Sequence, residues 1–165
     1  MNIQSILFPT DFSRYNDAAL EYASTLAAEA GATLHIVHVH DVRDLSSAMG
    51  EASYLYASTW QEELEAARER LNRISPTVPG VPCERHCLTG TPDEEIVNMA
   101  AEKSIDLIVM ASHGRTGLSR LVMGSVAEGV MRKAPCPVLI VKQPHEKDVE
   151  ELPAGTLQTE SGSSL

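Results

Sequence analysis

Short apolar runs alternate with helical patterns along the first 143 residues, and this alternation is the feature that most limits the fold. Five runs have the length and the aliphatic or β-branched composition of strands; they occupy residues 3–9, 33–40, 81–88, 106–110 and 137–142. Between them, apolar side chains recur at helical spacing in residues 13–31, 59–74, 91–104 and about 126–133. Parallel strands need crossover connections of this kind. The order of elements therefore predicts a parallel sheet.

Four of the five strand candidates are mostly apolar or β-branched, and residues 81–88, which include Glu84 and Arg85, are more polar. Continuously apolar strands are typical of sheets buried on both faces. We therefore predict an α/β fold, a single Rossmann-like domain in which helices cover both faces of a five-stranded parallel sheet. Residues 41–58 are too long for an ordinary connection, and we expect them to cap one end of the sheet.

Residue types at the ends of the helical segments predict where the helices begin and end. Ser13 is expected to cap the first helix at its N-terminus, and Gly31 to end it. Thr91 is expected to cap the helix before the fourth strand, with Pro92 at the first helical position.

The chain carries 23 acidic and 13 basic side chains, a net charge of −10. Such a surface repels nucleic acid and anionic lipid, so neither is expected as a partner. No apolar run approaches the roughly 18 residues of a membrane-spanning helix. The N-terminus lacks the basic and long apolar segments of a signal peptide. We therefore expect a cytoplasmic protein without membrane insertion.

Residues 144–165 differ in composition from the rest of the chain. They are rich in Ser, Gly and Thr, show no periodicity, and from residue 146 onward contain five acids and one lysine. Such a segment cannot bury enough apolar surface to fold by itself. We therefore expect a folded domain over residues 1–143 and an acidic, disordered tail over residues 144–165.

The three cysteines, Cys83, Cys87 and Cys136, are odd in number and widely split, which favours reduced thiols over a disulfide framework. Cys83, His86 and Cys87 together look like a fragment of a metal site. In a strand, however, residues 83 and 87 share one face while residue 86 points to the other. Buried strand cysteines are therefore the preferred interpretation.

The segment between the fourth strand and the last helix, residues 111–128, reads ASHGRTGLSRLVMGSVAE. In an open parallel sheet, ligands bind beyond the carboxyl ends of the strands, which is where this segment begins. Gly114 and Gly117 allow backbone conformations that bring N–H groups toward an anion. Arg115 and Arg120 add positive charge. The segment therefore has the composition of a phosphate-binding loop.

Ser125 and Glu128 have the spacing of a capping box, in which each side chain accepts a hydrogen bond from the other residue's backbone N–H. This spacing predicts a last helix that begins at about Val126, with Gly124 directly before its cap. The unpaired N–H groups and the positive dipole end of a helix start suit phosphate.

The same residues also fit a simpler interpretation. Glycines after a strand often only make turns, and capping boxes occur in helices that bind nothing. Asp11, just past the first strand, equally fits a cap for the helix that follows, and His113 equally fits a structural hydrogen bond. Two common nucleotide folds are disfavoured, because G-x-G-x-x-G does not follow the first strand and G-x-x-x-x-G-K-[ST] is absent.

Residues 3–142 resemble the universal stress protein family, in its nucleotide-binding branch. The shared stretches are ILFPTDFS at the first strand, VHV at the end of the second, GTPDEEIV before the fourth, and the run from DLIVM to VLIVK. The family's ATP motif is G-x2-G-x9-G-[ST]. Here Gly114, Gly124 and Ser125 match that motif, and Ala111 replaces its first glycine. The resemblance implies an adenine nucleotide alpha hydrolase-like fold.

The resemblance also implies which residues contact the adenosine end of a nucleotide. Asp11 would bind the ribose or the adenine side, with Pro9 and Thr10 beside it. Val39 would line the adenine pocket through its backbone, together with Met110.

At the phosphate end, the resemblance implies a wrap made by the glycine-containing segment and the start of the last helix. Its members would be Ser112, His113, Gly114, Arg115, Gly124, Ser125 and Val126. Ala111 stands at the tightest part of this wrap. Its methyl group is tolerable there if the local φ is negative, and prohibitive if the backbone touches phosphate at that point.

These observations favour a stress-response regulatory protein that binds ATP or AMP, with or without magnesium, and hydrolyses it slowly or not at all. The alternative is an interaction or scaffold protein of the same fold with a vestigial nucleotide pocket. A dedicated ATPase is disfavoured, because the 111–128 segment has no acidic pair placed for magnesium. By the same resemblance we expect a homodimer through residues 137–142 and a protein partner that the sequence does not identify.

Overall fold

The computed structural model describes residues 2–42, 53–112 and 123–142. Its strands are β1 (Ser5–Pro9), β2 (Thr33–Asp41), β3 (Cys83–Gly90), β4 (Leu107–Ala111) and β5 (Val138–Val141). Its helices are α1 (Asp17–Ala30), α3 (Ser53–Arg73), α4 (Pro92–Glu102) and α5 (Ser125–Lys133), and a 3-10 turn, η1 (Arg14–Asn16), precedes α1. The expected cap over residues 41–58 falls largely outside the described residues, since Asp41 extends β2 and α3 begins at Ser53.

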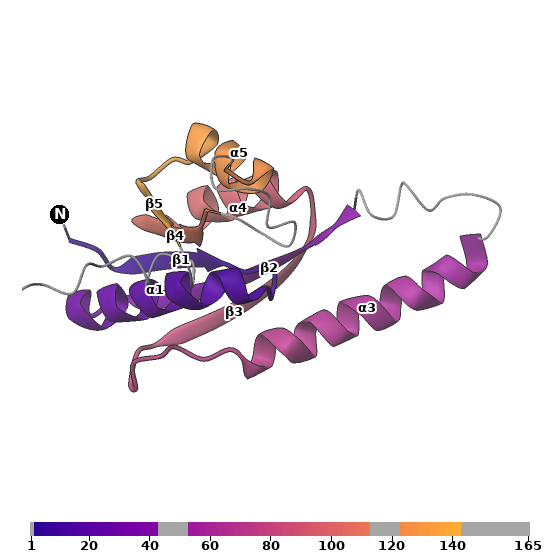
Figure 1. Cartoon of the computed structure of the whole chain (residues 1–165), viewed down its shortest axis with the longest axis horizontal. Helices are drawn as coiled ribbons and strands as arrows, with labels where there is room; N and C mark the ends of the chain where they lie inside the picture. Colours follow the sequence, from indigo (N-terminus) through magenta and orange to yellow (C-terminus); the bar gives the residue numbers. More distant parts are fainter. Residues whose placement is uncertain (1, 43–52, 113–122, 143–165) are drawn as a thin grey trace, which may run out of the picture.

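The five strands form one parallel sheet in the order β3-β2-β1-β4-β5. Helices α1 and α3 lie on one face of the sheet, and α4 and α5 lie on the other (Figure 1). The prediction of an α/β, Rossmann-like domain with helices on both faces is therefore confirmed. None of the helices in the described ranges is both long and apolar enough to cross a membrane.

Alternate residues of the strands fill two separate hydrophobic cores. Ile6 and Phe8 of β1 face α1 and α3, whereas Leu7 faces α4 and α5, and all three side chains are at most 1% exposed. The same alternation continues in the neighbouring strands, because successive side chains of a strand point to opposite faces. The central strands carry apolar side chains on both faces because helices cover both faces of the sheet.

Helix α1 packs closely against the sheet because its buried side chains are small. Ala19, Ala23 and Ala27 are fully buried at helical spacing. Ser24 is also fully buried; its hydroxyl donates to the carbonyl of Leu20 within the helix. This row of small side chains leaves room for the larger residues of β1 and β2 beneath it.

The helix ends confirm some of the predicted signals and correct others. Gly31 ends α1 in a left-handed conformation, with φ of 65°, as predicted. Ser13 does not cap α1, because η1 intervenes and α1 begins only at Asp17. Thr91 stands at the N-cap position of α4, but its side chain makes no capping hydrogen bond.

Helices α4 and α5 meet at a glycine. A Cβ atom at Gly129 would lie 2.6–2.9 Å from atoms of the Asp93 side chain, so only glycine leaves room for this contact. The Asp93 carboxylate also accepts a hydrogen bond from Lys133 Nζ at 3.0 Å. Because Asp93 belongs to α4 while Gly129 and Lys133 belong to α5, these contacts fix the two helices to each other.

Cys83 and Cys87 lie in strand β3, as the sequence predicts, but they are partly buried rather than fully buried. Cys83 and Cys87 both pack against the core on the α1 and α3 face, and the three cysteines are free thiols. Burial raises the pKa of the Cys83 and Cys87 thiols, so both stay protonated near neutral pH.

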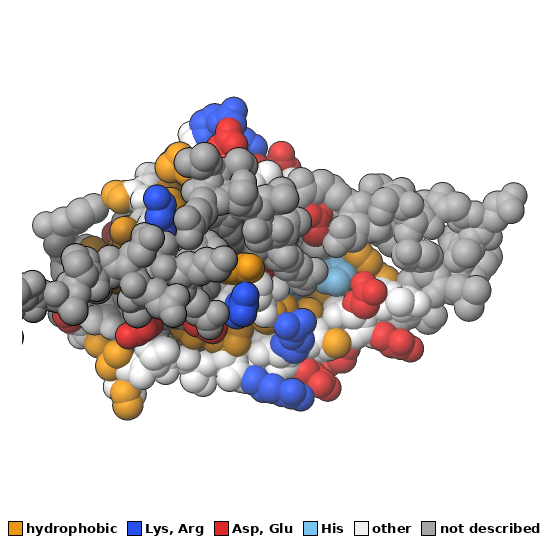
Figure 2. Space-filling view, in the orientation of Figure 1, with side chains coloured by type: hydrophobic (Ala, Val, Ile, Leu, Met, Phe, Trp, Pro, Cys, Tyr) orange, Lys and Arg blue, Asp and Glu red, His pale blue; other side chains and the backbone are white. Residues whose placement is uncertain are grey.

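The exposed face of α3 carries interspersed acidic and basic side chains (Figure 2). Arg73 lies 3.7 Å from Glu69, and Arg68 lies 3.4 Å from Glu65. All four side chains are more than half exposed, so each pair contributes little to stability. The helix is held instead by apolar residues such as Leu71, which is 2% exposed.

The close packing of α1 gives the first prediction. Ala23→Leu should lower the free energy of unfolding by about 1–3 kcal/mol, because the added atoms have no space beneath the helix. That loss corresponds to a fall in thermal midpoint of about 3–10 °C for a domain of this size. Ala28→Leu makes the same change at an exposed position of the same helix and should shift stability by less than about 0.5 kcal/mol. Equal effects of the two variants, measured by thermal unfolding, would contradict the packing argument.

Candidate functional site

A cavity of about 790 Å³ lies beyond the carboxyl ends of β1, β2 and β4, within the usual range for small-molecule sites. Helix α3 supplies one of its walls, and the start of α5 supplies another. The strand order reverses between β1 and β4, since the chain proceeds from β1 toward β3 on one side and reaches β4 on the other. Ligands of open parallel sheets bind at such a reversal.

Ten of the thirteen residues expected to contact nucleotide line this cavity. They are Pro9, Thr10, Asp11, Val39, Met110, Ala111, Ser112, Gly124, Ser125 and Val126. The other three, His113, Gly114 and Arg115, lie outside the described residues, as do Gly117 and Arg120. The fold thus brings together residues that are more than a hundred positions apart in the sequence.

Asp11 stabilises the turn that leads from β1 into η1. Its Oδ1 accepts hydrogen bonds from the Ser13 backbone N–H at 2.9 Å and from the Asn16 side-chain amide. Beside it, the Thr10 hydroxyl accepts from the Phe12 N–H at 3.1 Å. Phe12 has a φ of 65°, which is uncommon for a residue other than glycine. Asp11 is therefore not the cap of α1, whose N-cap is Asn16 without a side-chain capping bond; it holds the preceding turn and also lines the cavity.

His38 holds this turn from the neighbouring strand. Its ring is 4% exposed, and its Nδ1 lies 2.8 Å from the Thr10 carbonyl oxygen. A carbonyl oxygen can only accept, so Nδ1 carries the proton and donates it. The Phe12 ring packs against the imidazole with centroids 4.2 Å apart. β2 therefore sets the position of the β1 turn at the cavity.

The start of α5 lies at the cavity. The N–H groups of the first turn of a helix have no carbonyl partner within that helix, and here that turn includes Ser125, Val126 and Ala127, all of which line the cavity. Gly124 precedes them, and its N–H donates to the Ser112 carbonyl at 2.9 Å. This hydrogen bond ties the helix start to the end of β4.

The predicted capping box is not formed. Ser125 is already the first residue of α5, Gly124 is its N-cap, and no side chain caps the helix. The Glu128 carboxylate instead accepts a hydrogen bond from Arg132 at 2.9 Å, one turn further along. The physical reason is the backbone: once Ser125 is helical, its hydroxyl is no longer in the extended N-cap conformation from which it reaches the Glu128 N–H.

Gly124 is extended, with φ of −63° and ψ of 144°, a conformation open to any residue. A requirement for glycine at this position therefore concerns space rather than backbone angle.

The structure answers one part of the question raised by Ala111, which replaces the motif glycine: the sign of its φ. It is the last residue of β4, is 7% exposed, and belongs to the hydrophobic core on the α1 face. Its φ is not positive, since Phe12 and Ser104 are the positive-φ residues other than glycine in the described chain. The methyl group is therefore a packed core atom in an ordinary strand conformation.

The cavity lining also includes residues that were not expected from the sequence, among them His40, Trp60, Glu63 and Arg70. The His40 ring lies edge-on to Trp60, with centroids 4.2 Å apart, and its Nε2 is buried 3.7 Å from a Glu63 oxygen, too far for a hydrogen bond. Arg70 places its guanidinium 4.4 Å above the Phe12 ring. The sequence held one signal for this wall of the cavity. It is Trp60, the single tryptophan of the chain, which lies in a helix otherwise rich in charged residues.

Residues 2–142 match the family model described as the universal stress protein family. Among curated relatives, universal stress protein MJ0531 of Methanocaldococcus jannaschii is 37% identical over 145 residues, which cover 87% of this chain and 85% of that protein. Universal stress protein MJ0577 of the same organism is 34% identical over 154 residues, which cover 85% of this chain and 95% of that protein.

Solved structures agree with this match. The structure of protein MJ0577 has a TM-score of 0.77 at 30% identity, covering 88% of this chain and 99% of that one. A universal stress protein in complex with cAMP has a TM-score of 0.56 at 25% identity, covering 86% of this chain and 98% of that one.

The environment of Ala111 gives the second prediction. Ala111→Gly should lower the free energy of unfolding by about 0.5–1 kcal/mol, because glycine gains backbone freedom in the unfolded chain and leaves the core without a methyl group. The thermal midpoint should therefore fall by about 1–4 °C. A rise in the midpoint on this substitution would mean that the alanine is strained, against the extended geometry described above.

Proposed function

Because the chain belongs to the universal stress protein family, we propose that it is a stress-response regulatory protein whose state depends on adenine nucleotide, ATP or AMP, bound at the carboxyl edge of the sheet. The observation that supports this most is the convergence of ten expected contact residues around one cavity, beside the first turn of α5, whose N–H groups have no partner within the helix. A protein of the same family in complex with cAMP supports the choice of an adenine nucleotide.

In this proposal the phosphates lie against the start of α5. Backbone N–H groups there suit an anion, and the positive end of the helix dipole adds to the attraction. Ser112 and the segment that includes His113, Gly114 and Arg115 complete the phosphate contacts, with Gly124, Ser125 and Val126 on the helix side. Magnesium, where it accompanies ATP, binds through the phosphates.

The nucleoside then extends toward β1 and β2. Asp11, with Pro9 and Thr10, contacts the ribose side, while the Val39 backbone and Met110 line the adenine pocket. Trp60 and His40 close this end of the cavity. Their aromatic rings supply a largely apolar surface for a base.

Little or no hydrolysis is part of the proposal, so that the protein is at most a slow ATPase. Phosphoryl transfer needs groups that position a metal ion and the attacking water. Among the described cavity residues, the acids are Asp11, Asp41 and Glu63, from the segment after β1, from β2 and from α3. None comes from β4 or α5, where the phosphates would lie.

The second candidate is an interaction or scaffold protein with a vestigial pocket. It is supported by the lack of positive charge on the cavity wall where the phosphates would lie. Among the described cavity residues of β4 and α5 there is no lysine or arginine. We favour nucleotide binding because the cavity is lined by the start of α5, whose first N–H groups have no partner within the helix. In either case we place the protein in the cytoplasm, with residues 1–143 as the domain and residues 144–165 as a tail.

The third prediction tests the nucleotide site. ATP, ADP or AMP at about a hundred times its dissociation constant should stabilise the domain by roughly 2.7 kcal/mol, since ligand binds the folded state alone. The thermal midpoint should rise by about 5–10 °C. Gly124→Val should abolish the rise, and Gly124→Ala should reduce it by less. The backbone conformation at residue 124 is open to any residue, so the two variants differ only in the volume that they add. Ala111→Gly should leave the rise unchanged.

Midpoints of the three variants without nucleotide provide the control, so that lost folding is distinguished from lost binding. The interaction-protein candidate replaces the proposal if wild type and Gly124→Val both show no shift with any of the three nucleotides. A shift retained in full by Gly124→Val would place the phosphates elsewhere.

The fourth prediction concerns assembly. Among the described strands β5 stands at one edge of the sheet, where a strand can pair with another chain, and Leu139 on it is 37% exposed. We propose a two-fold homodimer through residues 137–142. Light scattering of the wild-type protein at tens of micromolar should give twice the mass of one chain, and a monomer at that concentration would contradict the proposal. The wild type is the clean measurement, because a charge placed at Leu139 could also unfold the monomer.

A further inference from the structure

A second group of polar side chains lies on the sheet, away from the cavity. His35 of β2 and Glu84 of β3 are partners in the strand register, and His86 follows Glu84 two residues along. The three side chains therefore share the face covered by α4. They lie toward the start of β2 and β3, and none of them lines the cavity. We call them the His35–Glu84–His86 group.

The nitrogen and oxygen atoms of this group converge on one point. His35 Nδ1 lies 3.3 Å from His86 Nε2 and 3.4 Å from Glu84 Oε2, and His86 Nε2 lies 3.5 Å from the same oxygen. The three distances are nearly equal, and all exceed the usual hydrogen-bond length of about 2.9–3.0 Å. The group is therefore poorly explained by direct hydrogen bonds between its members.

The distances match those between ligands of a tetrahedral metal ion. Ligand atoms placed about 2.0–2.2 Å from a metal at tetrahedral angles are about 3.3–3.6 Å apart. Octahedral coordination at the same bond lengths would bring neighbouring ligands to about 2.8–3.1 Å, closer than observed. Two imidazoles and one carboxylate also form a ligand set found at zinc sites that keep water in the fourth position.

From this geometry we propose that His35, Glu84 and His86 bind a tetrahedral divalent metal ion of the Zn²⁺ type, with water as the fourth ligand. The site is independent of the proposed nucleotide site, and its test can fail or succeed without affecting that proposal.

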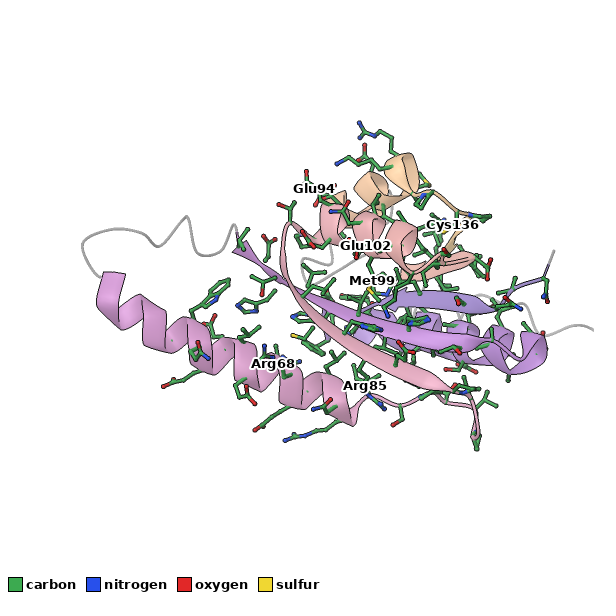
Figure 3. The ribbon with its side chains drawn as sticks, turned by 180° about the vertical axis from the view of Figure 1, so that it is seen from behind. Arg68, Arg85, Glu94, Met99, Glu102 and Cys136 are labelled. Carbon is green, nitrogen blue, oxygen red and sulfur yellow. The ribbon has the colours of Figure 1, made fainter. Side chains whose placement is uncertain are left out.

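The surroundings of the group are consistent with metal binding. Burial lowers the pKa of His35 and of His86, which favours the neutral ring, the form of imidazole that binds metal. The Glu84 side chain is 53% exposed, so the site opens to solvent at the free edge of β3, the outermost strand in Figure 3. An ion can therefore reach the group without unfolding of the sheet.

Lys103, at the end of α4, competes for the same carboxylate. Its Nζ lies 3.4 Å from Glu84 Oε2. A metal ion at the centre of the group would be repelled by this ammonium and would compete with it for Glu84. The Lys103 side chain is 40% exposed, so it can turn into solvent when an ion binds. Removal of its charge should therefore strengthen metal binding.

The fifth prediction uses Zn²⁺ alone as the probe, with the full chain and no nucleotide, in a calorimetric titration. The wild type should bind one Zn²⁺ ion at this site. Glu84→Gln and His86→Gln, at partly exposed positions that tolerate substitution, should each weaken binding by more than about a hundredfold, since even indirect support of a ligand is worth 10–100-fold. Glu102→Gln, an exposed carboxylate on α4 (Figure 3), and the double variant Cys83→Ser, Cys87→Ser should bind as the wild type does.

Two further measurements complete the test. Lys103→Met should bind Zn²⁺ more tightly than the wild type. Co²⁺ in place of Zn²⁺ should give the intense visible absorption of tetrahedral cobalt, and Glu84→Gln should lose it. The proposal is overturned if Zn²⁺ does not bind, if Glu84→Gln and His86→Gln bind it as the wild type does, or if the cysteine variant alone loses it. It is also overturned if Lys103→Met binds no more tightly, or if Co²⁺ gives only the weak absorption of six-coordinate cobalt.

Discussion

The parallel pairing of β1 with β2 on one side and β4 on the other is the interaction on which the rest of the structure depends. The Asp106 carboxylate holds the start of β1 against β4 by accepting hydrogen bonds from the backbone N–H groups of Gln4 (2.8 Å) and Ser5 (3.0 Å). At the other end, the helices that follow β1 and β4, α1 and α5, cover opposite faces of the sheet, and such a reversal leaves a gap above the pair. The cavity occupies this gap. The hydrogen bonds that organise both cores therefore also create the candidate site.

The sequence predicted the features that depend on local pattern and missed those that depend on distant contacts. Strand and helix order follow from apolar periodicity, and the end of α1 at Gly31 follows from the freedom of glycine at positive φ. The capping box at Ser125 failed because its spacing is satisfied equally by residues inside a helix. The wall made by Trp60 could not be predicted, because the path of α3 over the cavity is a property of the whole fold. Likewise, the meeting of His35 with Glu84 depends on the register of two strands about fifty residues apart.

Strand β2 shows how one strand can serve several purposes through residues of the same type. His38 is buried and hydrogen-bonded to the β1 turn, so its role is structural. His40, two residues further on, packs edge-on against Trp60 at the cavity. His35 lies toward the beginning of the strand, beside Glu84 and His86. Position along the strand decides the chemistry available to each ring, because the carboxyl end opens into the cavity and the amino end lies under α4.

The contact between Gly129 and Asp93 also restricts how this sequence can diverge. Any side chain at position 129 would displace the Asp93 carboxylate and with it the hydrogen bond to Lys133. Replacement of Gly129 would therefore be accepted only after position 93 had become smaller or α4 had moved outward. Among related chains, the residues at these two positions should vary together. A larger residue at position 129 should occur in chains whose α5, and with it that wall of the cavity, lies further from α4.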